Sequence, residues 1–192
     1  MKILTILGSP RRRGNTAAVL GMFEQQASAR HQVERINLTD YTVNGCLGCD
    51  ACQRKLDEPG CRQHDDALTI FERMKAADLI VYASPVYAWS ISAQLKALFD
   101  RHYCLVKWNA GEKALLAGRR AMLLVTCGGS ANENADLVQP MFARQMACMK
   151  MEVAGLFAVD NCTTPDELGE RAAATAAEMA RATDAAVRWA KP

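Results

Sequence analysis

The chain has 192 residues, 50% of them hydrophobic, and its 23 Lys and Arg against 21 Asp and Glu give a formal net charge of +2. This length and composition predict a single domain over residues 1–192 with a substantial core. The charges are dispersed, which argues against nucleic acid or an anionic membrane as a partner. No apolar run approaches the length of a membrane span.

The first residues do not have the pattern of a targeting signal. Met1-Lys2-Ile3 leads directly into a strand pattern, without the apolar segment and small-residue cleavage site of a signal peptide. We therefore expect a cytoplasmic protein. Its eight cysteines are then expected as reduced thiols or metal ligands rather than as disulfides.

The chain begins with a predicted strand, loop and helix. The strand is the apolar, β-branched run from Ile3 to Leu7, which ends at Gly8. A helix is predicted to start at Thr16, because apolar residues follow it at helical spacing. These residues are Val19, Leu20 and Phe23.

The loop between this strand and helix is a candidate anion site. It lies at a helix N-terminus, where unpaired backbone N–H groups and the helix dipole both favour negative charge. Side-chain donors and positive charges in the loop predict that the anion is a phosphate. They are Ser9, Arg11 to Arg13, Asn15 and Thr16. The stretch alone also fits a basic surface loop.

Two common phosphate motifs are absent from this loop. A Walker A loop would place Lys after Gly14, where this chain has Asn15-Thr16, and Gly8 and Gly14 are too far apart for G-x-G-x-x-G. Instead, Gly8-Ser9-Pro10-Arg11 with Gly14-Asn15-Thr16 resembles the FMN-phosphate loop of flavodoxin-like NAD(P)H-dependent FMN reductases. The resemblance implies that Ser9, Arg11, Gly14, Asn15 and Thr16 bind the phosphate of FMN.

The remaining elements alternate between strands and helices. Strands are predicted at 32–38, 78–83, 121–126 and 151–159, with Ser84-Pro85 ending the one at 78–83. Helices are predicted after a cap at Asp65, then at 90–101, at 136–149 and from Thr164 to about Trp189. The last helix has the clearest start, because Thr164-Pro165-Asp166-Glu167 fits a capping box.

Five strands alternating with helices predict a parallel sheet with helices on both faces. The resemblance implies a flavodoxin-like α/β three-layer sandwich, whose five-stranded parallel sheet has the order 2-1-3-4-5. In that order FMN binds where strands one and three flank the switch point. The loops at 8–15, 84–89 and 127–132 are then expected to open onto one rim.

Two of these loops resemble the flavin-ring loops of the same family. Ser84-Pro85-Val86-Tyr87-Ala88-Trp89 and the helix after it are similar to the family's S-P-V-Y segment, which implies that Pro85, Val86, Tyr87, Ala88 and Trp89 bind the ring system. Alternatively, the aromatic rings only cover the sheet edge. Thr126-Cys127-Gly128-Gly129 resembles the strand-four loop, which implies that Cys127, Gly128 and Gly129 lie beside the flavin.

A third feature is the cysteine spacing Cys46-x2-Cys49-x2-Cys52, with Cys61 as a fourth thiol. This spacing is used for cubic clusters, and it resembles the iron-sulfur flavoprotein branch of the same fold, which carries [4Fe-4S]. It also resembles family members without a cluster, and zinc or plain buried thiols stay open. Cys104, Cys148 and Cys162 are expected as buried thiols, and His31, His64 and His102 as surface or interface residues.

The resemblance implies an FMN-dependent oxidoreductase. It would take hydride from NADH or NADPH and reduce a quinone, a free flavin, a nitroaromatic or an electron-carrier protein. Homodimers or homotetramers are the family habit. The rival hypotheses are an iron-sulfur flavoprotein or flavodoxin-like electron carrier without a small-molecule substrate, and a zinc-stabilised binding protein on the same fold. The near-neutral charge disfavours the carrier, since such carriers tend to be strongly acidic.

Overall fold

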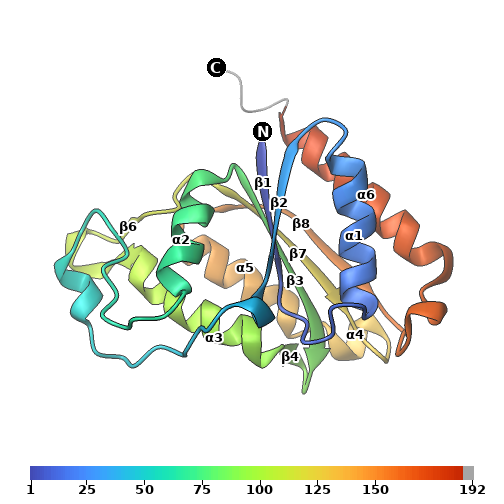
Figure 1. Cartoon of the computed structure of the whole chain (residues 1–192), viewed down its shortest axis with the longest axis horizontal. Coiled ribbons are helices and arrows are strands. Elements are labelled where there is room, and N and C mark those ends of the chain that lie inside the picture. Colours follow the sequence, from blue (N-terminus) through green and yellow to red (C-terminus); the bar gives the residue numbers. More distant parts are fainter. Residues whose placement is uncertain (188–192) are drawn as a thin grey trace.

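The computed structural model describes residues 1–187 and contains one main sheet between two layers of helices (Figure 1). Its parallel strands have the order β2-β1-β3-β7-β8. They are β1 Lys2–Leu7, β2 Gln32–Asn37, β3 Leu79–Tyr87, β7 Arg120–Thr126 and β8 Glu152–Val159. Numbered among themselves, these strands have the predicted order 2-1-3-4-5, which is therefore confirmed.

Helices cover both faces of the sheet, as expected from right-handed crossovers. In Figure 1 the helices α1 Asn15–Ala27 and α6 Gly169–Val187 lie on one face. The other face carries α2 Ala67–Ala76, α3 Ala93–Arg101 and α5 Val138–Cys148. The segment between β2 and α2, which holds the cysteine spacing, extends beyond this second layer.

The strands are buried on both sides, and β1 shows how the sequence achieves this. Leu4 and Ile6 point into the core under α2, α3 and α5, whereas Ile3 and Leu7 point into the core under α1 and α6. Because successive side chains of a strand alternate between faces, a continuous apolar run is what a doubly covered strand requires.

The strand at 78–83 does not end at Ser84-Pro85, so that prediction is wrong. β3 continues to Tyr87 and turns back through β4 Ser90–Ile91, its antiparallel partner, which makes the sheet six-stranded. The reason lies in the neighbouring strand β1. The backbone of Ala83 faces β1, since its carbonyl accepts from the Gly8 N–H, and the backbone of Pro85, two residues on, faces the same side. The pairing with β1 ends at Leu7 and Ala83, so no β1 carbonyl lies opposite Pro85. The missing N–H of the proline therefore costs no ladder hydrogen bond.

Helix starts differ from prediction in three places. The helix predicted at 90–101 begins at Ala93, because Ser92 is its N-cap and accepts a hydrogen bond from the Leu95 N–H at 3.3 Å. The helix predicted at 136–149 is divided into α4 Ala131–Asn134 and α5, and Pro140 lies in the first turn of α5, where no N–H is needed.

The third difference concerns the last helix. Its capping box at Thr164 and Glu167 is present, but it opens only the 3₁₀ turn η5 Pro165–Glu167. Gly169 then has φ +51°, a left-handed conformation that glycine adopts at little cost, and α6 follows. The predicted end near Trp189 lies outside the described residues.

His102 is a further correction, because it is buried rather than exposed. It lies in the 3₁₀ turn η3 His102–Leu105 with 0% of its surface accessible, among Phe71, Tyr82 and Phe99. Burial lowers the pKa of His102 to about 3, so the ring is neutral in the folded protein at pH 7.

Candidate functional site

The β1–α1 loop begins at Gly8, which is held from two sides. Its N–H donates to the Ala83 carbonyl at 2.7 Å, and its carbonyl accepts from Ser92 Oγ at 2.6 Å. A Cβ at this position would lie 2.7 Å from Leu95 Cβ, closer than real atoms approach. The loop therefore needs glycine here in order to stay against β3 and the start of α3.

Beyond Gly8 the backbone forms a cradle of unpaired donors at the start of α1. The first backbone hydrogen bond of the helix is from Ala18 N–H to the Gly14 carbonyl at 3.0 Å, so the N–H groups of the three preceding residues have no backbone acceptor within residues 1–187. The Asn15 side chain fixes the start of the helix, because its Nδ2 donates to the Cys162 carbonyl at 2.9 Å. The unpaired backbone N–H groups suit an anion.

Side chains around the cradle add hydroxyls and positive charge. Ser9 Oγ accepts from the Arg11 N–H at 3.1 Å, and the hydroxyls of Thr16 and Thr126 are 2.7 Å apart. Arg12 is paired with Asp40 beyond the end of β2, so its charge is partly neutralised. The charges of Arg11 and Arg13 form no ion pair among the described residues and remain for a ligand.

The loops at the carboxyl ends of β1, β3 and β7 converge on one cavity of about 780 Å³. Its lining includes most of the predicted cofactor residues: Ser9, Arg11, Gly14, Asn15, Thr16, Pro85, Val86, Tyr87, Cys127 and Gly128. Ala88, Trp89 and Gly129 are not among its lining residues. A cavity of this size is typical of cofactor sites.

A fourth loop also lines the cavity, and sequence reasoning missed it. It follows β8 and contributes Cys162, Thr163, Thr164 and Pro165. The signal was available, because β8 is the strand next to β7 and its carboxyl end must reach the same rim. We interpreted Thr164-Pro165 only as a helix cap, although hydroxyls at a strand end are also ligand donors.

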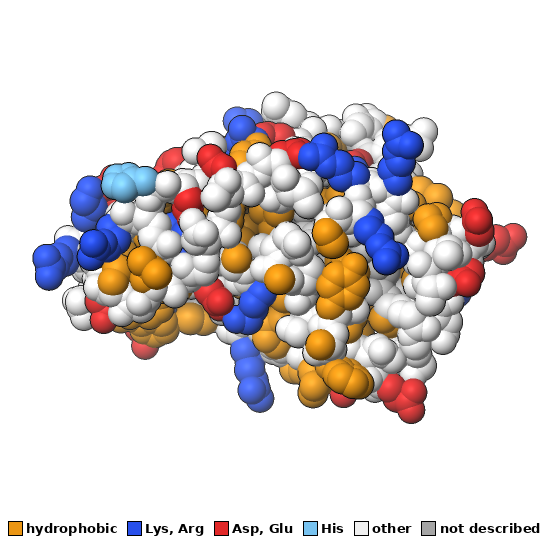
Figure 2. Space-filling model, turned by 60° about the horizontal axis from the view of Figure 1, so that its bottom comes forward, with side chains coloured by type: hydrophobic (Ala, Val, Ile, Leu, Met, Phe, Trp, Pro, Cys, Tyr) orange, Lys and Arg blue, Asp and Glu red, His pale blue; other side chains and the backbone are white. Residues whose placement is uncertain are grey.

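In the β3–β4 hairpin, Tyr87 faces the cavity, whereas Trp89 lies at the tip of the turn. Tyr87 lines the cavity and is 44% exposed. Ala88 and Trp89 form the tip, with φ +48° and +57°, as a tight two-residue turn requires. The Trp89 Nε1 donates to the Glu133 carbonyl at 3.0 Å, which ties the tip to α4. Figure 2, which turns this end of the molecule toward the viewer, shows hydrophobic side chains among mixed charges on this face.

The loops after β7 and β8 each bring one thiol to the cavity wall, Cys127 and Cys162. Cys162 N–H donates to the Cys127 carbonyl at 3.1 Å, so the two residues are held together. Burial, with smaller effects from Asp160 and Cys162, raises the pKa of Cys127 to about 11, and burial also raises the pKa of Cys162. Both thiols are therefore neutral at pH 7 and add no negative charge beside an anionic ligand.

The cavity fits FMN on its own chemistry. An anion cradle of unpaired backbone N–H groups and a Thr16–Thr126 hydroxyl pair lies at one part of the wall, and Pro85, Val86 and Tyr87 give an apolar part. A phosphate needs the first part and a flat ring system needs the second.

A separate feature is the cysteine segment, residues 44–65, which is clamped at its base. Arg101, 1% exposed, donates to both carboxylate oxygens of Asp65 at 2.7 and 3.1 Å and to the Asn44 carbonyl at 3.0 Å. Burial alone would raise the pKa of Asp65, but the bonds from Arg101 and from the N–H groups of Asn44 and Ala67 outweigh it and lower that pKa. The two ends of the segment are thus fixed together.

The clamped segment brings its four cysteines to one small cavity of about 10 Å³, which Arg101, Tyr103 and Cys104 also line. Cys46 and Cys49 are exposed, Cys61 is half-buried and Cys52 is buried. Among residues 1–187 no three His, Cys, Asp or Glu side chains are arranged to hold a metal ion. The four thiols and the buried Arg101 have the chemistry of a thiolate-ligated site, but in this arrangement the thiols are not gathered around one point.

No described helix is long and apolar enough to span a membrane.

Curated relatives are similar to part of this chain. An iron-sulfur flavoprotein of Methanosarcina thermophila is 36% identical over 133 residues, which is 69% of this chain and 65% of that protein. The chain matches 65%, 48% and 51% of the lengths of three such relatives, so it spans about half to two thirds of them.

Solved structures share the fold at low sequence identity. Smu.1420 from Streptococcus mutans matches with a TM-score of 0.75 and 16% identity, covering 94% of this chain and 100% of that one. An NAD(P)H:quinone oxidoreductase from Methanothermobacter marburgensis matches with a TM-score of 0.70 and 18% identity, covering 94% of each chain. The flavodoxin-like fold is therefore established.

The sequence pattern of one family matches residues 1–164, from β1 to the capping box after β8. The match includes every residue that lines the cavity except Pro165. The chain belongs to the NADPH-dependent FMN reductase family.

Proposed function

We propose that this chain is an FMN-dependent oxidoreductase that takes hydride from NADH or NADPH and reduces a quinone, a free flavin, a nitroaromatic or an electron-carrier protein. One observation carries the proposal: the unpaired N–H groups at the start of α1 open into the cavity on which the β1, β3 and β7 loops converge. Family membership and the name of the quinone oxidoreductase with the same fold support it.

We assign the residues of this cavity to two parts of FMN. The phosphate would be held by Ser9, Arg11, Gly14, Asn15 and Thr16, through backbone N–H groups, hydroxyls and one guanidinium. The ring system would lie against Pro85, Val86 and Tyr87, with Cys127 and Gly128 beside it. A role in binding the ring stays only a prediction for Ala88, Trp89 and Gly129, because these residues do not line the cavity.

FMN, when bound, supplies the redox chemistry, accepting hydride at its N5 atom and passing on the electrons. The protein orients the cofactor and shapes the space beside its ring. Neutral Cys127 and Cys162 thiols leave the positive charges of the cradle uncompensated, which favours the phosphate.

Anaerobic stopped-flow mixing with NADH and then NADPH tests the activity. We expect at least one of them to bleach the absorption band of bound flavin within seconds, and added quinone to restore it. Failure of both nicotinamides, together with rapid reduction by a flavoprotein reductase, would instead favour the electron-carrier hypothesis.

We also propose that Cys46, Cys49, Cys52 and Cys61 ligate a [4Fe-4S] cluster. The support is that all four thiols line one cavity with Arg101, and that similar proteins are named iron-sulfur flavoproteins. In a protein that also binds FMN, a cluster would let a two-electron cofactor hand on single electrons.

Metal analysis after anaerobic reconstitution decides between cluster, zinc and plain thiols. We expect close to four irons per chain, and loss of most of them in C46S, C49S, C52S and C61S. C148S, a half-buried thiol outside the cavity, is the matched control and should keep its iron. One zinc per chain, or neither metal, contradicts the cluster and leaves the reductase proposal intact.

By analogy with the family, we propose that the chain forms a homodimer or homotetramer. Light scattering, which gives the molar mass in solution, would test this.

A further inference from the structure

The β1–α1 loop carries three consecutive arginines, Arg11, Arg12 and Arg13, and the proposed FMN site uses only the first of them. The loop turns at these residues, because the Gly14 N–H donates to the Arg11 carbonyl at 3.1 Å. This bond closes a β-turn whose central residues are Arg12 and Arg13. All three arginines are exposed and line the cavity, so two positive charges at its rim are not yet assigned to a ligand.

Arg11 is the arginine that lies against the phosphate cradle. A Cβ on Gly14, the N-cap of α1, would lie 3.0 Å from Arg11 Cβ and 3.7 Å from Arg11 Cδ. The three atoms nearest to that Cβ all belong to Arg11. The Arg11 side chain therefore follows the start of the helix, where the unpaired N–H groups are, whereas the turn carries the next two arginines past it.

The other two arginines differ in their partners. Arg12 forms an ion pair with Asp40, the last residue of the 3₁₀ turn η1 Leu38–Asp40 after β2, so part of its charge is neutralised. Arg13 forms no ion pair with any residue of the described chain. A guanidinium without an anionic partner at the wall of a cavity is available to an anion that enters it.

The wall of this cavity carries no carboxylate within residues 1–187, since none of its lining residues is Asp or Glu. Two acidic residues of the β8 loop have partners of their own. Asp160 pairs with Arg171 at 3.3 Å, and Glu167 accepts from the backbone N–H of Thr163. A ligand in the cavity therefore meets positive side chains and no negative ones.

This composition distinguishes the two coenzymes that could supply hydride. NADH and NADPH differ at the adenosine ribose, which carries a 2′-hydroxyl in NADH and a 2′-phosphate in NADPH. A site that favours NADH supplies a carboxylate to accept from the hydroxyl, and this carboxylate repels a phosphate. A site that favours NADPH supplies arginine, whose planar guanidinium binds phosphate through paired N–H donors. The rim of the cavity has the second composition.

We propose that Arg13 determines coenzyme specificity by binding the 2′-phosphate of NADPH, so that the protein oxidises NADPH in preference to NADH. The inference rests on the proposed reductase function, in which a nicotinamide coenzyme delivers hydride to FMN in this cavity. Arg11 serves the FMN phosphate, and Asp40 holds Arg12 toward β2. Because Arg13 is exposed, salt should screen its attraction for the coenzyme.

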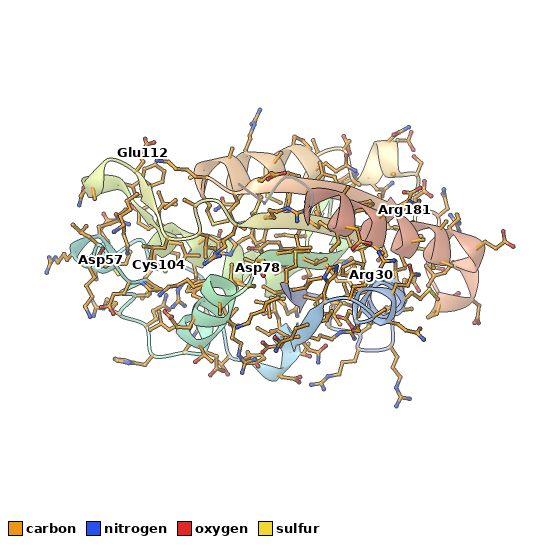
Figure 3. All side chains as sticks on the ribbon, turned by 90° about the horizontal axis from the view of Figure 1, so that it is seen from above. Arg30, Asp57, Asp78, Cys104, Glu112 and Arg181 are labelled. Carbon is orange, nitrogen blue, oxygen red and sulfur yellow. The ribbon has the colours of Figure 1, made fainter. Side chains whose placement is uncertain are left out.

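Steady-state kinetics with both coenzymes compare the wild type with R13Q, which removes the charge and keeps N–H donors, and with R13K, which keeps a charge without the planar fork. Arg181 gives the matched control R181Q, because it is also an exposed arginine. It lies on α6 and lines, with Arg30, a separate cavity that shares no lining residue with the FMN site (Figure 3). Titration with FMN, with R11Q for comparison, reports on the cofactor site of each variant.

We expect the wild type to favour NADPH over NADH in kcat/KM by at least about tenfold, and R13Q to lose about tenfold of this preference, as one charge-assisted contact provides. The loss should be in KM for NADPH, with kcat within about twofold of wild type, since the contact is the same in the ground and transition states. R13K should lie between them, and R181Q should match the wild type. Added salt should lower the preference of the wild type more than that of R13Q.

An FMN-loaded R13Q protein with the wild-type preference overturns the inference and leaves the reductase standing, and so does a wild type that prefers NADH. If R13Q loses FMN affinity as strongly as R11Q, Arg13 serves the FMN phosphate instead, which also overturns the inference. Failure of both coenzymes to reduce FMN in the wild type contradicts the proposed reductase itself, and stopped-flow mixing shows that result separately.

Discussion

The hydroxyls of Thr16 and Thr126 lie 2.7 Å apart and connect the first turn of α1 to the carboxyl end of β7. If the Thr126 hydroxyl donates to Thr16, the proton of Thr16 is free for a ligand in the cavity that both residues line. This hydrogen bond thus connects two of the loops that make the site and can leave the Thr16 hydroxyl proton for the ligand.

We predict that T16V weakens FMN binding by roughly 10- to 100-fold, because a hydrogen bond to a charged group is worth about 1.5–3 kcal/mol. T16S keeps the hydroxyl and should stay within about threefold of wild type. Fluorescence quenching of added FMN measures both affinities. Equal losses in T16V and T16S would contradict the role of the hydroxyl and indicate a packing effect of the methyl group.

We predict that G8A destabilises the protein by about 1–3 kcal/mol, as overpacking of a tight site does. The added Cβ would meet Leu95 Cβ at 2.7 Å, and FMN affinity should fall as the loop moves. G21A in α1 is the control, since its Cβ would meet only Arg35 Nη2 at 3.6 Å. It should be stabilising by about 0.5–1 kcal/mol, because alanine is the better helix former. A G8A protein as stable as G21A in urea would refute the packing argument.

The Arg101–Asp65 ion pair leads to a prediction about the base of the cysteine segment. D65N should lower the free energy of unfolding by about 3–5 kcal/mol, because it leaves a buried guanidinium unpaired. E72Q, which removes an exposed pair with Lys75, should cost less than about 1 kcal/mol. Chemical denaturation at neutral pH gives both values. Similar small losses would mean that the clamp does not hold the segment.

His102 makes stability depend on pH. Its pKa falls from an ordinary 6.5 to about 3 in the folded state, so between these values the unfolded chain binds a proton that the native ring does not. Stability therefore rises with pH through this window and is lost as pH falls below 6.5. Lowering the pH from 7.5 to 5 should cost about 2 kcal/mol through this residue.

H102F is the variant that tests this. Neither ring nitrogen of His102 has a hydrogen-bond partner within the described chain, and the ring packs against Phe71, Tyr82 and Phe99. Phenylalanine should therefore be accepted and should flatten the pH profile of stability between 5 and 7.5. An unchanged profile would assign the acid sensitivity to other groups.

The apolar runs of the sequence predicted the strands and the loops where three of them end, and the resemblance to the FMN reductases implied the order of the sheet. The sequence did not predict the path of the chain after Ala83. Whether Pro85 stops a strand depends on the length of the neighbouring β1, which is tertiary information. The same holds for His102, whose burial results from packing of three aromatic rings.

The fourth loop was missed for a different reason. Thr164-Pro165 carries a strong local capping signal, and that signal is real. It hid the second use of the same residues, which is visible only once the carboxyl end of β8 is placed beside that of β7.

Residues 8–16 are proposed to hold the phosphate of flavin mononucleotide, and comparison of FMN with riboflavin tests that role directly. Riboflavin has the same ring system without the phosphate. Isothermal titration should give FMN at least about 100-fold higher affinity, since several charge-assisted hydrogen bonds of about 1.5–3 kcal/mol each are involved. Equal affinity for the two ligands, or binding of neither, would contradict the account.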